Sequence, residues 1–180
     1  DSFMASDAST DDILGQEFLT WLWYKSDTQP SQFSTIAGEP FSVSMEQRIV
    51  VQGGSGETRE TASVTGAFSP LGEARYGLGT GKKVTRALLR LEKADMAFQL
   101  IVKAEDFSFG SLKTPKIEKD SDANEADPDA LFLEKIYLME VCVDLIESLY
   151  QTFLSDRFSD AWEETVTDIR EWFTTPNSPA

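Results

Sequence analysis

Apolar residues recur every three or four positions near both ends of this chain, which indicates helices there. Between residues 11 and 25, Leu14, Phe18 and Leu22 fall on one face of a helix, joined by Trp21, and Asp11 or Asp12 is a suitable N-cap. The neighbouring Trp21 and Trp23 are expected to belong to the core and not to a ligand platform.

The longest helix is predicted from Pro128 for about 25 residues, because apolar side chains step alternately by four and three along it. Such a heptad seam packs either on the rest of the protein or against a second copy of the same helix. Both alternatives involve the same residues: Phe132, Ile136, Met139, Val143, Ile146, Tyr150 and Phe153. A final helix is expected over about 159–174, with Ser159 or Asp160 as its N-cap and one apolar face formed by Trp162, Val166, Ile169 and Phe173.

The middle of the chain alternates apolar and polar residues with a period of two, which is typical of strands with one buried face. Residues 41–51 form the first such strand, and residues 57–65 are expected to return from it after the turn sequence GGSG. Residues 82–92 and 96–104 are predicted to form a second hairpin around the break KAD, and residues 106–113 to add a short strand. A short helix is expected after Ser69.

These elements predict an α+β fold: an antiparallel sheet of two hairpins, with an N-terminal helix, a long C-terminal helix and a final helix. We expect residues 1–117 to form the α+β sheet domain and residues 118–130 an acidic loop. Residues 131–180 are expected to form the C-terminal helices, which pack on the same domain.

Composition excludes several kinds of chemistry. The chain has 180 residues with no histidine and one cysteine, Cys142. Zinc sites built from Cys and His, Ser-His-Asp triads and an internal disulfide are therefore excluded, and Cys142 is expected to be a buried, inert thiol. We expect a cytoplasmic protein that is not an enzyme and needs neither metal nor cofactor. A magnesium-dependent enzyme that uses carboxylates is the weaker alternative.

No apolar run approaches the roughly 20 residues that a membrane span requires, so we expect no membrane association. The chain starts at Asp1 and not at a methionine, and we therefore expect it to be a piece of a longer protein.

A basic, glycine-led segment, GLGTGKKVTRALLRLEK at residues 77–93, stands out in a chain whose formal net charge is −15. It is not a Walker A phosphate loop, because Tyr76 stands where the first glycine belongs and Lys83 where Ser or Thr belongs. Strand alternation puts several of its basic side chains on one face, where they could contact DNA phosphates. The alternative is that they keep a hairpin soluble. The candidate DNA contacts are Lys82, Lys83, Arg86, Arg90, Lys93 and Lys103.

Three stretches of the chain resemble the C-terminal half of the RdgC-type recombination-associated proteins. They are FLTWLW at residues 18–23, the stretch at residues 81–102 with the trailing Ser111-Leu112-Lys113, and the helix sequence at residues 127–149. By position, Gly81, Lys82, Lys83, Thr85 and Arg86 match the family's Gly-Lys and Val-Thr strand and its basic follower.

The resemblance implies an α+β fold and a cytoplasmic, nucleoid-associated homodimer that binds duplex DNA without sequence preference. Such proteins limit access of the strand-exchange recombinase to DNA, and so modulate homologous recombination. The chain departs from the family in its net charge of −15 and in the uncharged strand Ser63-Val64-Thr65. The alternative function is an acidic protein–protein interaction module, including one that resembles DNA in its charge.

Overall fold

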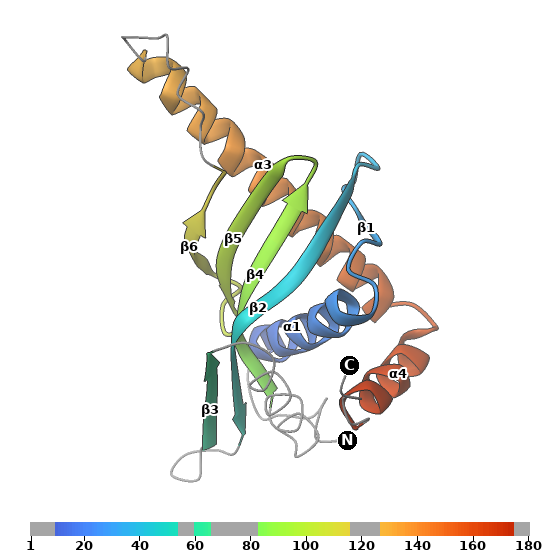
Figure 1. The fold of residues 1–180 in the computed structure, drawn as a ribbon. Coiled ribbons are helices and arrows are strands. Elements are labelled where there is room, and N and C mark those ends of the chain that lie inside the picture. The colour runs from blue at the N-terminus through green and yellow to red at the C-terminus, as the bar shows by residue number, and fades with distance from the viewer. Residues whose placement is uncertain (1–9, 54–59, 66–82, 116–126, 175–180) are drawn as a thin grey trace, which may run out of the picture.

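The computed structural model describes residues 10–53, 60–65, 83–115 and 127–174, and their arrangement confirms the α+β fold (Figure 1). The short helix expected after Ser69, the candidate contact Lys82 and most of the acidic loop lie outside these ranges. The elements follow one another as α1 (Thr10–Thr28), β1 (Phe33–Ser34), β2 (Pro40–Gly53), β3 (Glu60–Thr65), β4 (Lys83–Lys93), β5 (Met96–Lys103), β6 (Phe109–Lys113), α3 (Pro128–Arg157) and α4 (Trp162–Thr174).

The strands form one antiparallel sheet in the order β1-β2-β4-β5-β6, and β3 pairs with the far half of β2. The predicted hairpins are present as β2–β3 and β4–β5, and β6 is the predicted additional strand. The β4–β5 turn is tight, since Lys93 pairs with Met96 across Ala94 and Asp95. Ala94 has a φ of 53°, the left-handed conformation that two-residue hairpin turns favour.

A bulge in β4 breaks the alternation that the sequence predicts. Val50 pairs with Arg86 but the next residue, Val51, pairs with Val84, so one residue of β4 is extra at this point. Val84 is therefore buried together with Ala87, Leu89 and Leu91. Unbroken alternation over residues 82–92 would place Val84 on the same face as Arg86, but the bulge resets which side chains face the core.

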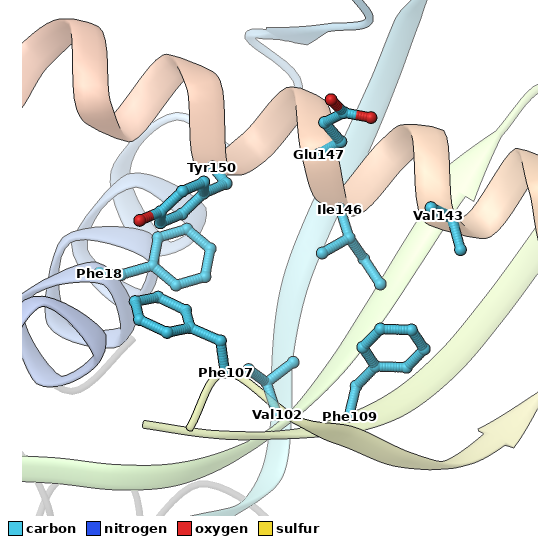
Figure 2. Close-up of a pocket in the computed structure, with 8 residues that line it drawn as sticks. All are labelled: Phe18, Val102, Phe107, Phe109, Val143, Ile146, Glu147 and Tyr150. Atoms are coloured by element: carbon cyan, nitrogen blue, oxygen red, sulfur yellow. The ribbon is translucent and has the colours of Figure 1, made fainter. Parts of the chain in front are cut away.

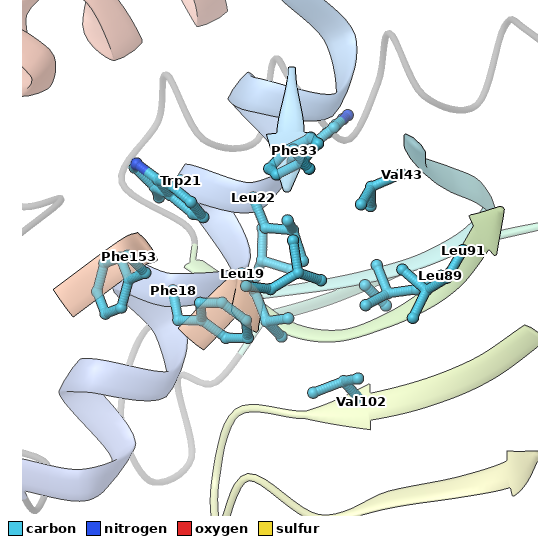
Figure 3. Close-up of a cluster of buried hydrophobic side chains, with 14 of the residues drawn as sticks. Phe18, Leu19, Trp21, Leu22, Phe33, Val43, Leu89, Leu91, Val102 and Phe153 are labelled. Carbon is cyan, nitrogen blue, oxygen red and sulfur yellow. The ribbon is translucent and has the colours of Figure 1, made fainter. Parts of the chain in front are cut away.

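Helix α1 is buried on several sides and not along one face as predicted. It packs on β2 and β4 and also contacts α3 and α4. Figure 3 shows Leu19 and Leu22 among the strand residues of the core, and Phe18 and Trp21 beside Phe153 of α3. The ring centroids of Phe18 and Trp21 lie 5.4 Å and 5.6 Å from that of Phe153. Trp23 is buried as well, which confirms that the tryptophan cluster is core.

Polar contacts join α1 to the two C-terminal helices. The Trp21 indole nitrogen donates a hydrogen bond to Asp156 at 3.0 Å. Arg157 donates from Nε to the buried carboxylate of Glu17 at 2.7 Å. Trp172 of α4 donates from its indole to Asp27 at 2.6 Å. Sequence-distant ends of the chain are therefore held together by directional contacts as well as by apolar burial.

The helix ends follow local signals with small corrections. Pro128 is the first residue of α3, and the Asp127 side chain accepts a hydrogen bond from the Asp129 backbone as its N-cap. Helix α1 begins at Thr10, so neither Asp11 nor Asp12 is its N-cap.

Helix α4 begins at Trp162, later than predicted, because a turn comes first in which the Trp162 backbone donates to the Ser159 carbonyl. Neither Ser159 nor Asp160 is therefore its N-cap. Its buried face consists of Trp162, Val166, Ile169 and Trp172, while Phe173 is half-buried.

We expect Gly15→Ala to destabilise the protein. A Cβ at this position of α1 would overlap the carbonyl oxygen of Ala104, which immediately follows β5. The resulting shift of the helix should lower the free energy of unfolding by about 1–3 kcal/mol. At an uncrowded helix position the same change would raise it by about 1 kcal/mol, so the sign of the effect is informative.

Urea denaturation of Gly15→Ala measures this effect, and Gly110→Ala is the matched control. An added Cβ at Gly110 meets no atom within 4 Å, so this variant should unfold near the wild-type midpoint. Stabilisation by Gly15→Ala would contradict the close approach of α1 to Ala104.

Candidate functional site

The sheet has one face toward the helices and one face that no described helix covers. Figure 1 shows α3 passing behind the strands, so the uncovered face is turned to the viewer. Residues on β4 and β5 that alternate with the core point to it, and all are half-buried or exposed. This open face carries Arg86, Leu88, Arg90, Glu92, Ala97, Gln99, Ile101 and Lys103.

Strand register gathers basic side chains on the open face. Arg86 lies directly opposite Lys103, so their Cβ atoms are about 5 Å apart. Arg90 lies opposite Gln99, which in turn lies opposite Lys113 of β6. Two strand spacings, about 10 Å, therefore separate Arg90 from Lys113. We call Arg86, Arg90, Lys103 and Lys113 the basic strip; it combines three predicted contacts with Lys113, which the sequence did not nominate.

The charges of the basic strip are only partly neutralised. Arg90 pairs with Glu92 on the same face, with 2.5 Å between Nε and the carboxylate oxygen. The pKa of Asp106 is lowered, first by hydrogen bonds from Ser108 and then by the charge of Lys103. Among the described residues no ion pair is recorded for Arg86 or Lys113. Glu92 and Asp106 thus offset part of the charge of Arg90 and Lys103, whereas Arg86 and Lys113 keep theirs available to an anion.

Two other predicted DNA contacts, Lys83 and Lys93, do not belong to the basic strip. Lys83, next to the buried Val84, lies at the start of β4 and is half-buried. Lys93 shares the strand parity of Leu89 and Leu91, so it faces the helices and not the open face. It forms an ion pair with Glu39, and the hydrogen bond to Glu39 is the main cause that raises the pKa of Lys93. The nearby Tyr137 and Asp144 of α3 contribute in the same direction.

Acidic residues dominate the helical side of the molecule. Residues 128–174, which form α3 and α4, contain eleven Asp and Glu residues but three Lys and Arg residues. The sheet thus separates a basic strip on its open face from the acidic helices on its other face.

The predicted seam of α3 is divided by burial. Phe153 is fully buried, and Ile146 and Tyr150 pack at the margin of the core, which confirms packing for this end. Phe132, Ile136, Met139 and Val143 expose between 36% and 63% of their surface. Pairing of the exposed end with a second copy stays a prediction.

Other chemistry in the described residues is limited. No group of three or more His, Cys, Asp or Glu side chains there is placed to hold a metal ion. None of the described helices has the length and apolarity that crossing a membrane requires. No protein-family model, curated protein or solved structure matches this chain significantly. The geometry of the open face therefore carries the functional argument without support from relatives.

We expect Cys142 to react extremely slowly in the folded protein. It is fully buried, and burial raises the pKa of its thiol to about 11. At about pH 8 the reactive thiolate is then roughly one part in a thousand, and reagents also lack access. Labelling with Ellman's reagent should be slow in buffer and fast in denaturing urea.

A Ser155→Cys variant in a Cys142→Ala background is the control, because position 155 is exposed on the same helix. Its thiol should react at once in the native protein. Equal native reactivity of the two thiols would show that Cys142 is not buried as described.

Proposed function

We propose that this chain is a non-enzymatic module that binds duplex DNA without sequence preference through the open face of its sheet. The observation that carries the proposal is the register of β4, β5 and β6, which gathers Arg86, Arg90, Lys103 and Lys113 on one uncovered surface. Phosphate contacts by such side chains release counterions from DNA, and this term supplies most non-specific affinity.

The shape of the face favours backbone contact over base reading. Direct readout of sequence needs an element that enters the major groove, such as a helix or a two-stranded ribbon. The basic strip instead lies on the surface of β4, β5 and the edge strand β6, with Leu88 and Ile101 between its charged rows. Its long side chains can reach phosphates from there, whereas base edges lie deeper in the grooves.

The chain is acidic overall, but most of the acids of its C-terminal helices lie across the sheet from the open face (Figure 1). Acids on the outer side of α3 are separated from the open face by a helix about 10–12 Å thick and by the sheet itself. That separation exceeds the Debye length of about 8–10 Å at ordinary ionic strength. A duplex on the open face is therefore attracted by the nearby basic strip and only weakly repelled by the acidic helices.

The proposed role in recombination rests only on the resemblance to RdgC-type proteins. On that basis the protein is cytoplasmic and nucleoid-associated, and it modulates homologous recombination by occupying duplex DNA. The DNA-binding part does not depend on the resemblance, because it rests on the placement of the basic side chains.

We expect Arg86→Gln and Lys103→Gln each to weaken duplex binding and its dependence on salt. Each lost phosphate contact should reduce the slope of log K against log salt by about 0.9. The double variant should show a reduction of about 1.8, because the two residues contact neighbouring phosphates independently. Fluorescence anisotropy with a labelled duplex, titrated at several salt concentrations, measures both affinity and slope.

Lys135→Gln is the matched control, since Lys135 is exposed on α3, on the helical side of the molecule. It removes the same charge from the protein but should leave the slope unchanged. If Lys135→Gln and Arg86→Gln weaken binding equally, only the net charge matters and the open face is not the DNA site. If the wild-type protein does not bind the duplex even at low salt, the proposal is also rejected.

A further inference from the structure

The first half of α3 extends past the sheet and leaves apolar side chains without cover. Figure 1 shows this end of the helix running beyond the strands. The helix has 30 residues, which gives a length of about 45 Å. Five adjacent strands span only about 19 Å between the outermost two. Leu138 and Cys142 are buried in this half and Leu131 and Val141 are half-buried, while Phe132, Leu133, Ile136, Tyr137 and Met139 are exposed.

Two cavities along one side of α3 turn this exposed surface into a groove. One has a volume of about 430 Å³, and Val102, Phe107 and Phe109 line it opposite Ile146 and Tyr150 of α3 (Figure 2). The other has a volume of about 370 Å³ and lies along Ile136, Met139 and Val143. Both cavities include Val143 and Glu147, so they adjoin beside the helix, and we call the two together the groove. The described residues that line the second cavity all belong to α3.

An aromatic cluster shapes the deeper end of the groove. The ring of Phe107 lies 5.2 Å from Tyr150 and 6.3 Å from Phe18. Phe107 has a φ of 55°, a left-handed conformation that a bulky residue rarely adopts. Backbone strain of this kind persists where the surroundings hold it and is concentrated at binding sites. The groove is thus formed before any ligand arrives.

The rim of the groove is acidic. Glu140, Asp144 and Glu147 line the cavities together with the apolar residues of α3. Lys135 is the single basic residue of α3 before Arg157. An occupant that brings basic side chains is therefore favoured electrostatically, and an anionic lipid surface or nucleic acid is disfavoured.

We propose that this groove binds an amphipathic helix of a partner protein, with apolar residues on one face and Lys or Arg beside them. Apolar anchors at helical spacing would enter the groove, as in other helix-in-groove complexes. From Ile136 to Tyr150 the groove runs for about 21 Å, the length of a partner helix of about 14 residues. A bulky anchor would occupy the aromatic end at Phe107, Phe109 and Tyr150.

Charge separates this occupant from the two alternatives within the chain. A second copy that paired through α3 would bring Glu140 and Glu147 against the same acidic rim, and like charges in contact oppose association. The chain's own segment 116–126 has four acids against two lysines, and Ile117 is its single large apolar residue. Neither alternative supplies both the apolar anchors and the basic flanks.

Two synthetic peptides of about 16 residues test the proposal. Both carry Leu at positions i, i+3, i+4 and i+7; one has Lys at the flanking positions and the other has Glu. We expect saturable binding of the Lys peptide, measured by fluorescence anisotropy, and no binding of the Glu peptide. Val143→Asp should weaken the Lys peptide at least about tenfold, because it removes a central apolar contact. Reversal of both Glu140 and Glu147 to Lys should weaken it by about three- to tenfold.

Leu133→Asp is the matched control, since Leu133 is exposed on the same helix but lines neither cavity. It should leave peptide affinity unchanged, and circular dichroism checks that every variant folds. Equal binding of the two peptides, or binding of neither, rejects the proposal. Sedimentation of the protein alone as a dimer that Val143→Asp dissociates would also reject it, because a second copy would then occupy the groove. None of these outcomes bears on DNA binding, which uses the open face of the sheet.

Discussion

Because α1 is apolar around most of its circumference, the sheet and the C-terminal helices must close around it. Its leucines face β2 and β4, and its aromatic rings face α3 and α4. Gly15 lets the helix approach the backbone after β5 more closely than any side chain would permit. The polar contacts Glu17–Arg157 and Asp27–Trp172 then fix how the C-terminal helices lie against it. The arrangement of both candidate surfaces follows from this packing.

One such consequence is that the helices cover the same face of the sheet. The buried apolar residues of β4 and β5 pack against α1 and α3, so the alternate residues face solvent. These alternate residues carry Arg86, Arg90 and Lys103 together with one acid, Glu92, while α3 and its acids lie on the other side of the sheet (Figure 1). A second consequence concerns α3: α1 covers only its second half, so apolar residues of the first half stay exposed, and the groove begins among them.

Local signals in the sequence predicted the elements well. Pro128 marks the start of α3, and period-two alternation marks β2, β4 and β5, because these signals lie within a few residues of the structure they specify. Lys93 lies two residues from the buried Leu91, so the same alternation places it on the helical side and separates it from the other predicted DNA contacts.

Other features depend on partners far away in the chain. The bulge that buries Val84 exists only when β4 is paired with β2, and the residue types of β4 do not predict it. Lys113 joins the basic strip through the register of β6 against β5. The burial of Trp172 and the division of the α3 seam both depend on where α1 lies. These features arise from packing between elements, which a single sequence does not encode in its local pattern.

The contact between Glu17 and Arg157 joins residues that are 140 positions apart in the chain. A ribosome that adds about 5–20 residues per second needs roughly 7–28 s to make that length of chain. Throughout this time the tryptophans and leucines of α1 have no C-terminal helices to pack against. Contacts of such long range also slow folding after synthesis is complete. The core around α1 therefore cannot be completed until the last two helices have been made.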